Sequence, residues 1–227
     1  MWLVVAYEPV AAFGLRPSNT TSSGGKSLLV PTPYAVKMAL LDRLIRYGGL
    51  AYGIDRFALV RDLTIWLRVP HAASVNRTFQ KVLRPGGNPW NETIAQREYV
   101  FHAGPMMLAF GDLDTEMAGE LALILPSINY FGRKGGFMQY AGHTEQPTAP
   151  TRSDGFVNLC AASDPDDVGF GFLQRMDDMH AGATFEDVSV FDKPRSDGGR
   201  ITYNVVLPYQ LAYHGFNHTV YEAEPMP

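Results

Sequence analysis

Four residues near the N-terminus, Gly24-Gly25-Lys26-Ser27, are of the types that bind phosphate. They resemble the end of a nucleotide-binding P-loop, GxxxxGK[ST], in which backbone N–H groups and a lysine hold the phosphates. The first glycine of that motif would stand at position 20, where this chain has Thr20, and Pro31 and Pro33 interrupt the passage into a helix. The sequence therefore argues against ATP or GTP binding here. A basic, glycine-rich loop before a helix can still hold another phosphate on its N–H groups.

Two further stretches combine basic residues with glycine or aromatic residues. The first, Gly132-Arg133-Lys134-Gly135-Gly136, is either a tight turn or a loop whose glycines let a ligand approach the backbone closely. The second, residues 71–96, contains three basic residues and two aromatic ones but one acidic residue, Glu92. These five are Arg77, Lys81, Arg84, Phe79 and Trp90. The turn signal at 84–89 predicts a long loop or an extended hairpin with a basic surface, although a plain surface loop fits the composition equally well.

The bulk composition bounds the class of protein. The chain has 227 residues, of which 46% are hydrophobic and 19% charged, as in ordinary globular proteins. Residues 1–100 carry twelve basic and six acidic residues, whereas residues 101–227 carry seven and seventeen. A basic front half suits an anionic partner such as a nucleic acid. One cysteine, no apolar run long enough for a membrane span and no signal-like N-terminus predict a cytoplasmic protein.

Metal and cofactor chemistry is poorly supported. His214 and His218 have an i, i+4 spacing, but Gly215 disfavours a helix there and the sequence shows no third ligand. We assign no role to the other histidines considered, His71, His102 and His180. The sequence therefore predicts neither a metal nor a cofactor.

The elements that must position these residues follow from hydrophobic periodicity. Strands are predicted at 2–10 and 62–69, at 97–101 and 106–110, and after the Gly-basic loop; residues 51–60 are expected to be a partly extended connection. A helix over 33–47 begins with Thr32 as its cap and Pro33 at its first position, and a second helix runs from Asp112 or Asp114 to Pro126. If residues 71–96 are treated as an insertion into the fold, the predicted order of strands and helices over the first 140 residues is close to β-α-β-β-α-β. This predicts an α+β, ferredoxin-like (RRM) domain with an extended hairpin.

The rest of the chain is expected to be a smaller, irregular, β-containing C-terminal region. Residues 144–153 read as a linker, so the predicted division is 1–143 for the main domain and 144–227 for an extension. One long strand is predicted there, at 201–207. Met176, Met179 and the acidic pairs at 166–167 and 177–178 are expected on a solvated surface or a docking face.

Three stretches resemble the CRISPR-associated RAMP family usually called Cas-five. They are Ala12-Phe13 after the first strand, the Pro-rich helix entry over 30–37, and the series from Arg97-Glu98-Tyr99 through Phe110, Pro126 and Tyr130-Phe131-Gly132-Arg133-Lys134. Each motif is weakly specific, and their order and spacing over residues 2–140 carry the resemblance.

The resemblance implies a subunit of a type I Cascade complex that binds the 5′ handle of the guide RNA and contacts the backbone and large subunits. The expected setting is antiviral defence or RNA-guided DNA targeting. Residues 71–96 would be the thumb, where Arg77, Lys81 and Arg84 meet phosphates and Phe79 or Trp90 stacks. Gly132, Arg133 and Lys134 would reach the handle. Arg16, Lys26 and Lys37 would line the same side.

Some members of the resembled family cleave precursor guide RNA with a tyrosine, a lysine and a histidine. Lys134 has no neighbouring histidine in this sequence, and nothing places Tyr47 and His102 beside a lysine. We therefore expect no catalytic residues and no enzyme activity. The alternatives are a guide-RNA-processing endoribonuclease of the same family, or a ferredoxin-like scaffold that binds only protein.

Overall fold

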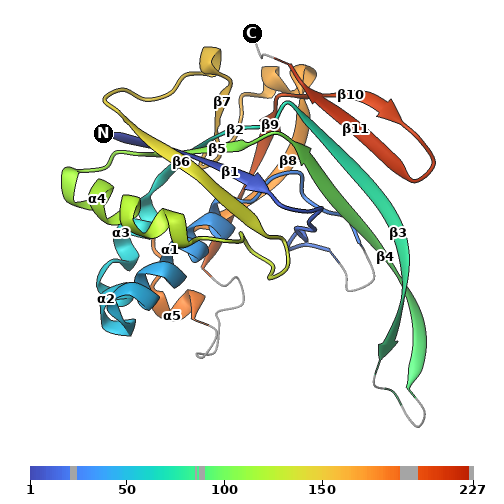
Figure 1. The fold of residues 1–227 in the computed structure, drawn as a ribbon, viewed down its shortest axis with the longest axis horizontal. Coiled ribbons are helices and arrows are strands. Elements are labelled where there is room, and N and C mark those ends of the chain that lie inside the picture. The colour runs from blue at the N-terminus through green and yellow to red at the C-terminus, as the bar shows by residue number, and fades with distance from the viewer. Residues whose placement is uncertain (21–24, 85, 87–89, 190–198, 225–227) are drawn as a thin grey trace.

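The first strand, β1 (Trp2–Pro9), lies inside a five-stranded antiparallel sheet with the order β6-β1-β5-β2-β7 (Figure 1). Its partners are β2 (Thr64–Arg68), β5 (Met106–Gly111), β6 (Met138–Gln146) and β7 (Phe156–Asn158). The computed structural model describes residues 1–20, 25–84, 86, 90–189 and 199–224. The expected mixed α+β class is confirmed. Across the sheet, β6, β1, β5 and β2 are neighbours in that order; numbered by their order along the chain, these four strands run fourth, first, third, second.

Two helices lie on one side of this sheet, as Figure 1 shows for α1 (Pro33–Gly48) and α4 (Thr115–Ile124). The predicted caps are confirmed: Thr32 Oγ1 accepts from the Ala35 N–H at 3.2 Å, and Asp114 Oδ1 accepts from the Met117 N–H at 2.8 Å. Each cap satisfies a backbone donor that has no partner within its helix, which is worth about 1 kcal/mol.

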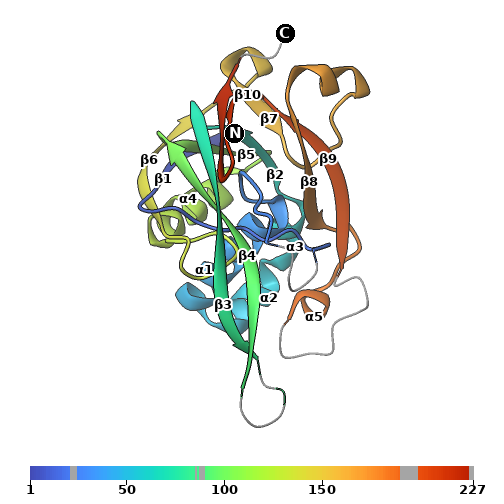
Figure 2. The same cartoon turned by 90° about the vertical axis from the view of Figure 1, so that its right-hand side faces the viewer.

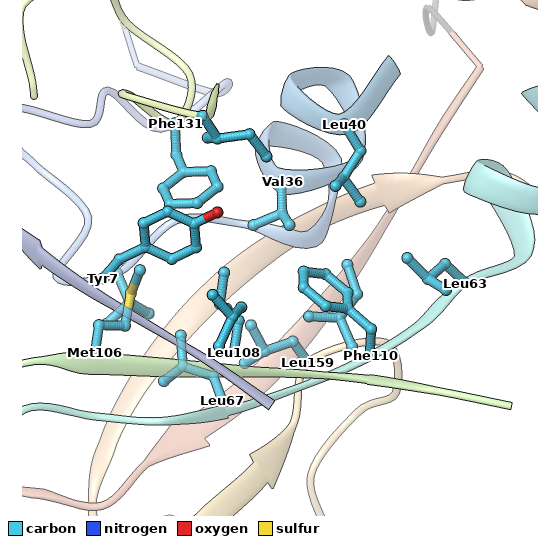
Figure 3. Packing of buried hydrophobic residues seen from close by; sticks show 14 of the residues in the cluster. Tyr7, Val36, Leu40, Leu63, Leu67, Met106, Leu108, Phe110, Phe131 and Leu159 are labelled. Atoms are coloured by element: carbon cyan, nitrogen blue, oxygen red, sulfur yellow. The ribbon is translucent and has the colours of Figure 1, made fainter. Parts of the chain in front are cut away.

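The main core fills the space between these helices and the sheet (Figure 3). The inward residues of β1, Leu3, Val5 and Tyr7, are fully buried there, and Tyr7 packs edge-on against Phe131 with ring centroids 5.0 Å apart. Tyr7 also donates its hydroxyl to the Leu125 carbonyl at 2.8 Å, so its polar end is satisfied. Each such side chain contributes roughly 1.5–3 kcal/mol by leaving water.

The expected extended connection at 51–60 is wrong, because the chain forms two short helices there. They are α2 (Leu50–Asp55) and α3 (Phe57–Asp62). Gly49 turns the chain with φ 89°, a backbone angle that glycine adopts without strain. Phe57 and Val60, three residues apart, then pack into the main core. The short helices therefore depend on tertiary burial more than on their own length.

Within the part of the chain that the structure describes, the longest pair of strands is an antiparallel hairpin. Strands β3 (Ala72–Arg84) and β4 (Asn91–Ala103) pair antiparallel from Ala72↔Ala103 to Arg84↔Asn91. Figures 1 and 2 show this hairpin projecting well beyond the rest of the molecule. The separate strand expected at 97–101 is instead the continuation of β4, because its pairing with β3 is unbroken.

The C-terminal part is more regular than expected. Besides β7, it contains β8 (Phe172–Met179) paired with β9 (Arg200–Leu207), and β10 (Tyr209–His214) paired with β11 (His218–Ala223). Among the described residues of this part, the helical segments are α5 (Phe185–Val188) and 3-10 turns at Arg152–Asp154 and Pro165–Phe170; another 3-10 turn, Leu125–Ser127, follows α4.

Two strands of that C-terminal part join sheets built by the N-terminal part. β11 pairs with β3 and β7 pairs with β2, so residues 1–143 and 144–227 share two sheets. β6 also runs to Gln146, into the expected linker. Among the described residues no helix is both long and apolar enough to cross a membrane.

Candidate nucleic-acid interface

Three adjoining cavities share basic lining residues and together form what we call the basic groove. The first, about 340 Å³, lies between the start of α1 and β9. The second, about 400 Å³, shares Arg16 and Arg133 with it, and the third, about 700 Å³, shares Lys26 and Arg97 with the second. The cations lining the groove are Arg200, Arg133, Arg16, Lys26, Arg97 and Arg77, and the carboxylates are Asp177 and Glu98. The groove is therefore strongly positive, as a polyanion requires.

The loop before α1 is held against β4, which places Arg16 and Lys26 in the groove. Phe13 exchanges backbone hydrogen bonds with Val100 at 2.9 and 2.7 Å, and the Gly25 carbonyl accepts from the Glu98 N–H at 2.7 Å. A Cβ on Gly25 would lie 1.8 Å from the Gln96 carbonyl oxygen, so only glycine fits there. Gly24, which the sequence analysis grouped with it, lies outside the described residues.

The Gly-basic loop is a tight turn that also lines the groove. Gly132 and Gly135 have φ of 72° and 103°, which favour glycine, and buried Phe131 anchors the loop in the core. Arg133 is exposed and lines two of the three cavities, and Gly132 lines one. Lys134 is exposed but lines none of the three. The two interpretations of this loop, turn and ligand approach, are thus compatible.

On the β3–β4 hairpin, alternation along β3 places Arg77, Phe79 and Lys81 on one face. Arg77 and Phe79 line the groove, and Arg77 Nε lies 3.2 Å from Glu98 Oε1. Lys81 lies further toward the tip, with Nζ 3.4 Å from Glu92 Oε2, and Trp90 is 60% exposed near the tip. The Arg84 side chain lies outside the described residues.

Lys37 does not belong to the basic side of the molecule, contrary to the prediction. Its side chain is buried, with Nζ 2.7 Å from Asp178 Oδ1 and donating to the Arg61 carbonyl at 2.8 Å. Lys37 faces the core from α1, since it follows buried Val36 and precedes buried Leu40 and Leu41. An ammonium already paired inside the protein is not available to bind RNA.

The acidic surface predicted for the C-terminal part is also largely wrong. Met176, Met179, Asp177 and Asp178 of β8 are all buried, as is Asp167. The buried carboxylates have cationic partners: Asp178 pairs with Lys37, Asp177 lies 3.5 Å from Arg200, and Asp167 accepts from both terminal nitrogens of Arg152. Asp166 alone of the four is exposed.

Sequence reasoning missed three groove residues, Arg97, Arg200 and Phe216. The Arg200 guanidinium carbon lies 3.9 Å from the centroid of the Tyr34 ring, a cation–π contact at the start of α1. Phe216 lines the largest of the three cavities from the turn between β10 and β11. The sequence Gly215-Phe216-Asn217 between two β-rich runs is a hairpin signal that could have found this turn.

The histidines and tyrosines considered for catalysis are not brought together. His102 is buried; burial lowers its pKa to about 4, and its Nε2 bonds the Leu29 carbonyl at 2.7 Å. Tyr47 lies exposed at the end of α1. A different pair, Tyr140 and His143 on β6, shares a hydrogen bond of 2.5 Å.

No group of three or more metal-ligating side chains occurs among the described residues. His214 and His218 lie on opposite strands of a hairpin, with His214 bonded to Thr219 and the His218 ring stacked on Tyr213. Their i, i+4 spacing is therefore not a helical one.

Comparison with known proteins identifies one curated relative, CRISPR-associated protein Cas5 from Archaeoglobus fulgidus. It is 28% identical over 150 residues, which are 63% of this chain and 60% of that protein, so the match spans less than two thirds of the relative. This similarity confirms the resemblance that the sequence indicated. No protein-family model matches the chain.

Two solved structures are distant structural matches. A crystal structure of a CRISPR protein from Archaeoglobus fulgidus has a TM-score of 0.42 and 12% identity, covering 98% of this chain and 92% of that one. A chain of the type III-B Cmr-beta complex, solved by cryo-electron microscopy with cognate target RNA and AMPPnP, has a TM-score of 0.43 and 8% identity, covering 97% and 86%.

Proposed function

We propose, from the premise that this chain is related to the Cas5 proteins, that it is a non-catalytic RNA-binding subunit of a type I CRISPR Cascade complex. It caps the 5′ handle of the guide RNA and contacts the backbone and large subunits, in the cytoplasm. It meets target DNA only through the complex. The setting is antiviral defence or RNA-guided DNA targeting.

The observation that carries this proposal is the basic groove. Its six cations and two carboxylates lie on a protein whose formal net charge is −4, so positive charge is concentrated there against the overall balance. Most of the groove's cations are arginines, which suit phosphate because their planar donors bind two oxygens at once. The groove would therefore bind RNA by phosphate contact and shape, without base-by-base recognition.

Two features of the fold support the proposal, the strand order of the main sheet and the projecting β3–β4 hairpin. The strand order fourth-first-third-second, with helices on one face, is what a β-α-β-β-α-β ferredoxin-like domain has. In our proposal the projecting β3–β4 hairpin is the thumb, and Lys81 and Trp90 near its tip touch RNA or the adjoining subunit. Residues 1–143 supply most of the basic side chains that would bind RNA, and the extension of residues 144–227 completes the groove with Arg200 and Phe216.

The test is binding of repeat-derived single-stranded RNA by the purified chain across a salt series. We expect Arg16→Ala with Arg133→Ala to weaken binding and to lower the slope of log affinity against log salt by about 1.4, for two lost phosphate contacts. The matched control replaces Arg46 and Arg175, two exposed arginines outside the groove, with alanine. Equal losses in both double variants would reject the groove as the RNA site.

Arg133 and Lys134 form a second informative pair. Since Arg133 lines the groove and Lys134 does not, Arg133→Ala should weaken RNA binding more than Lys134→Ala, and the double change should weaken it most. A purely protein-binding scaffold predicts no RNA affinity to lose. Sequencing any RNA that co-purifies with the protein would identify the handle.

The endoribonuclease alternative has one supporting observation, the hydrogen-bonded pair of Tyr140 and His143. A phenol beside an imidazole can move a proton during RNA cleavage. Incubating the protein with repeat RNA in the absence of metal distinguishes the two functions. A discrete product that disappears in Tyr140→Phe would replace our non-catalytic assignment.

A further inference from the structure

Two exposed phenylalanines from distant parts of the chain line the same cavity of the basic groove. Phe216, in the turn between β10 and β11, is 99% exposed, and Phe79 on β3 is 67% exposed. Both line the cavity of about 700 Å³, a volume within the range of ordinary ligand sites. A single exposed phenylalanine needs no explanation, but two on one basic cavity form a surface that a planar ligand can fill.

The turn that carries Phe216 is tied to β3 by one backbone hydrogen bond and closed by another. The Arg77 N–H donates to the Asn217 carbonyl at 2.7 Å, and the Gly215 N–H donates to the His218 carbonyl at 2.8 Å. His218 pairs with Asn76 in the β11–β3 register, and its ring stacks on Tyr213 with centroids 5.0 Å apart. The backbone that places Phe216 on the same cavity as Phe79 is therefore already ordered, which lowers the entropy cost of binding.

The charges around the two rings indicate the chemistry of the ligand. Lys26, Arg77 and Arg97 line the same cavity. Its one carboxylate, Glu98, already accepts from Arg77 and from the Ser27 N–H. An apolar protein segment would gain nothing from three cations, whereas single-stranded nucleic acid offers both a flat base and a phosphate.

We propose that Phe79 and Phe216 hold one unpaired base of the bound RNA between them, with the adjoining phosphates on Lys26 and Arg97. This inference rests on the proposed function and adds to it, since it makes the β10–β11 hairpin part of the RNA site. Stacking on aromatic rings tolerates every base, so the clamp fixes position along the strand without selecting sequence.

The experiment uses the full chain and a single-stranded RNA of about ten nucleotides, within the site sizes of small RNA-binding folds. Each RNA in the series is oligouridine with 2-aminopurine at one position, whose fluorescence falls when the base stacks. We expect the wild-type chain to quench this fluorescence, most strongly at one position, and Phe216→Ala should abolish the quenching and weaken binding about five- to 150-fold. Phe216→Trp should restore both, because it restores a stacking surface.

Two controls separate this clamp from the groove as a whole. Phe170→Ala removes another exposed phenylalanine, which lines none of the three cavities, and should change neither signal. Phe216→Ala should leave the salt slope unchanged because no phosphate contact is lost. Phe79→Ala combined with Phe216→Ala should cost little more than the larger single change, since the two rings hold one base.

The failures are distinguishable. If the wild-type chain binds no RNA at any salt concentration, the proposed function fails and the clamp fails with it. If RNA binds with the expected salt dependence but no position is quenched, or Phe216→Ala binds as tightly as wild type, only the clamp is rejected. A Phe216→Ala variant that retains RNA binding and loses association with another protein subunit would also overturn the clamp, in favour of a protein contact.

Discussion

Lys37 and Asp178 form a buried ion pair, with 2.7 Å between Nζ and Oδ1 and side chains 3% and 6% exposed. Lys37 lies on α1 and Asp178 on β8, and Lys37 also donates to the Arg61 carbonyl in α3. The pair therefore joins the first helix of the chain to a strand of its C-terminal part. It is a structural tie, and it removes one basic residue from the set available to RNA.

Breaking this pair should be costly. Lys37→Met leaves the Asp178 carboxylate buried without its counter-charge, so we expect a loss of about 3–5 kcal/mol in the free energy of unfolding. Lys37→Met with Asp178→Leu should recover most of that loss, because no charge remains buried. Urea denaturation measures both. Lys81→Met, which breaks an exposed pair, should cost less than about 1 kcal/mol, and a similar cost at both lysines would contradict the buried tie.

The free energy of unfolding should depend on pH through the protonation of His102. Burial lowers its pKa in the folded protein to about 4, and its Nδ1 has no hydrogen-bond partner. In the unfolded chain a histidine titrates near pH 6.5, so between pH 6.5 and about 4 only the unfolded state takes up this proton. His102 therefore costs the folded state nothing above pH 6.5. Below that pH the free energy of unfolding falls as acid is added, by roughly 3 kcal/mol in all by about pH 4.

The measurement is the free energy of unfolding at a series of pH values for wild type, His102→Phe and the control His180→Gln, which replaces an exposed histidine. His102→Phe should flatten the fall between pH 6.5 and 4, while His180→Gln should keep it. An unchanged slope in His102→Phe would show that other groups cause the acid loss.

Gly25 should be required for RNA binding through backbone packing. An added methyl would lie 1.8 Å from the Gln96 carbonyl oxygen, so Gly25→Ala must push the loop carrying Lys26 away from β4. We expect Gly25→Ala to weaken RNA binding and reduce its salt slope. Gly119→Ala, where the methyl meets open space inside α4, should leave binding unchanged and stabilise the protein by up to about 1 kcal/mol.

Cys160 should be chemically inert in the folded protein. Burial raises the pKa of its thiol to about 12, so almost no thiolate forms at neutral pH. We expect iodoacetamide at pH 8 to label it slowly in buffer and rapidly in urea. Lys37→Met should speed labelling in buffer only as far as it increases the unfolded fraction, which urea titration of the same variant checks. Fast labelling of the stable wild-type chain would place the thiol in solvent.

Local sequence determined much of the scaffold. The helix that begins at Pro33 with its cap at Thr32, four of the five main-sheet strands and the turn glycines follow from spacing and from backbone preferences that act within a few residues. The extended hairpin is one of the two structures that the turn signal at 84–89 predicts. Arg16, Lys26, Arg77, Phe79 and Arg133 could be identified as candidates because the family resemblance assigns their basic stretches to RNA, and all five line the groove.

Tertiary structure decided which of these charges meet. Lys37 reads like its neighbours in composition, yet Asp178, far along the chain, pairs with it in the core. Arg200 and Phe216 reach the groove only because β9 pairs with β8 and β11 pairs with β3. Periodicity specifies which face of an element is buried, but a cation's partner depends on contacts between segments that local sequence does not encode. The same limit hid α2 and α3. The burial that stabilises α3 comes from Phe57 and Val60, which pack into a core built by distant segments, and Tyr52 of α2 packs against that core.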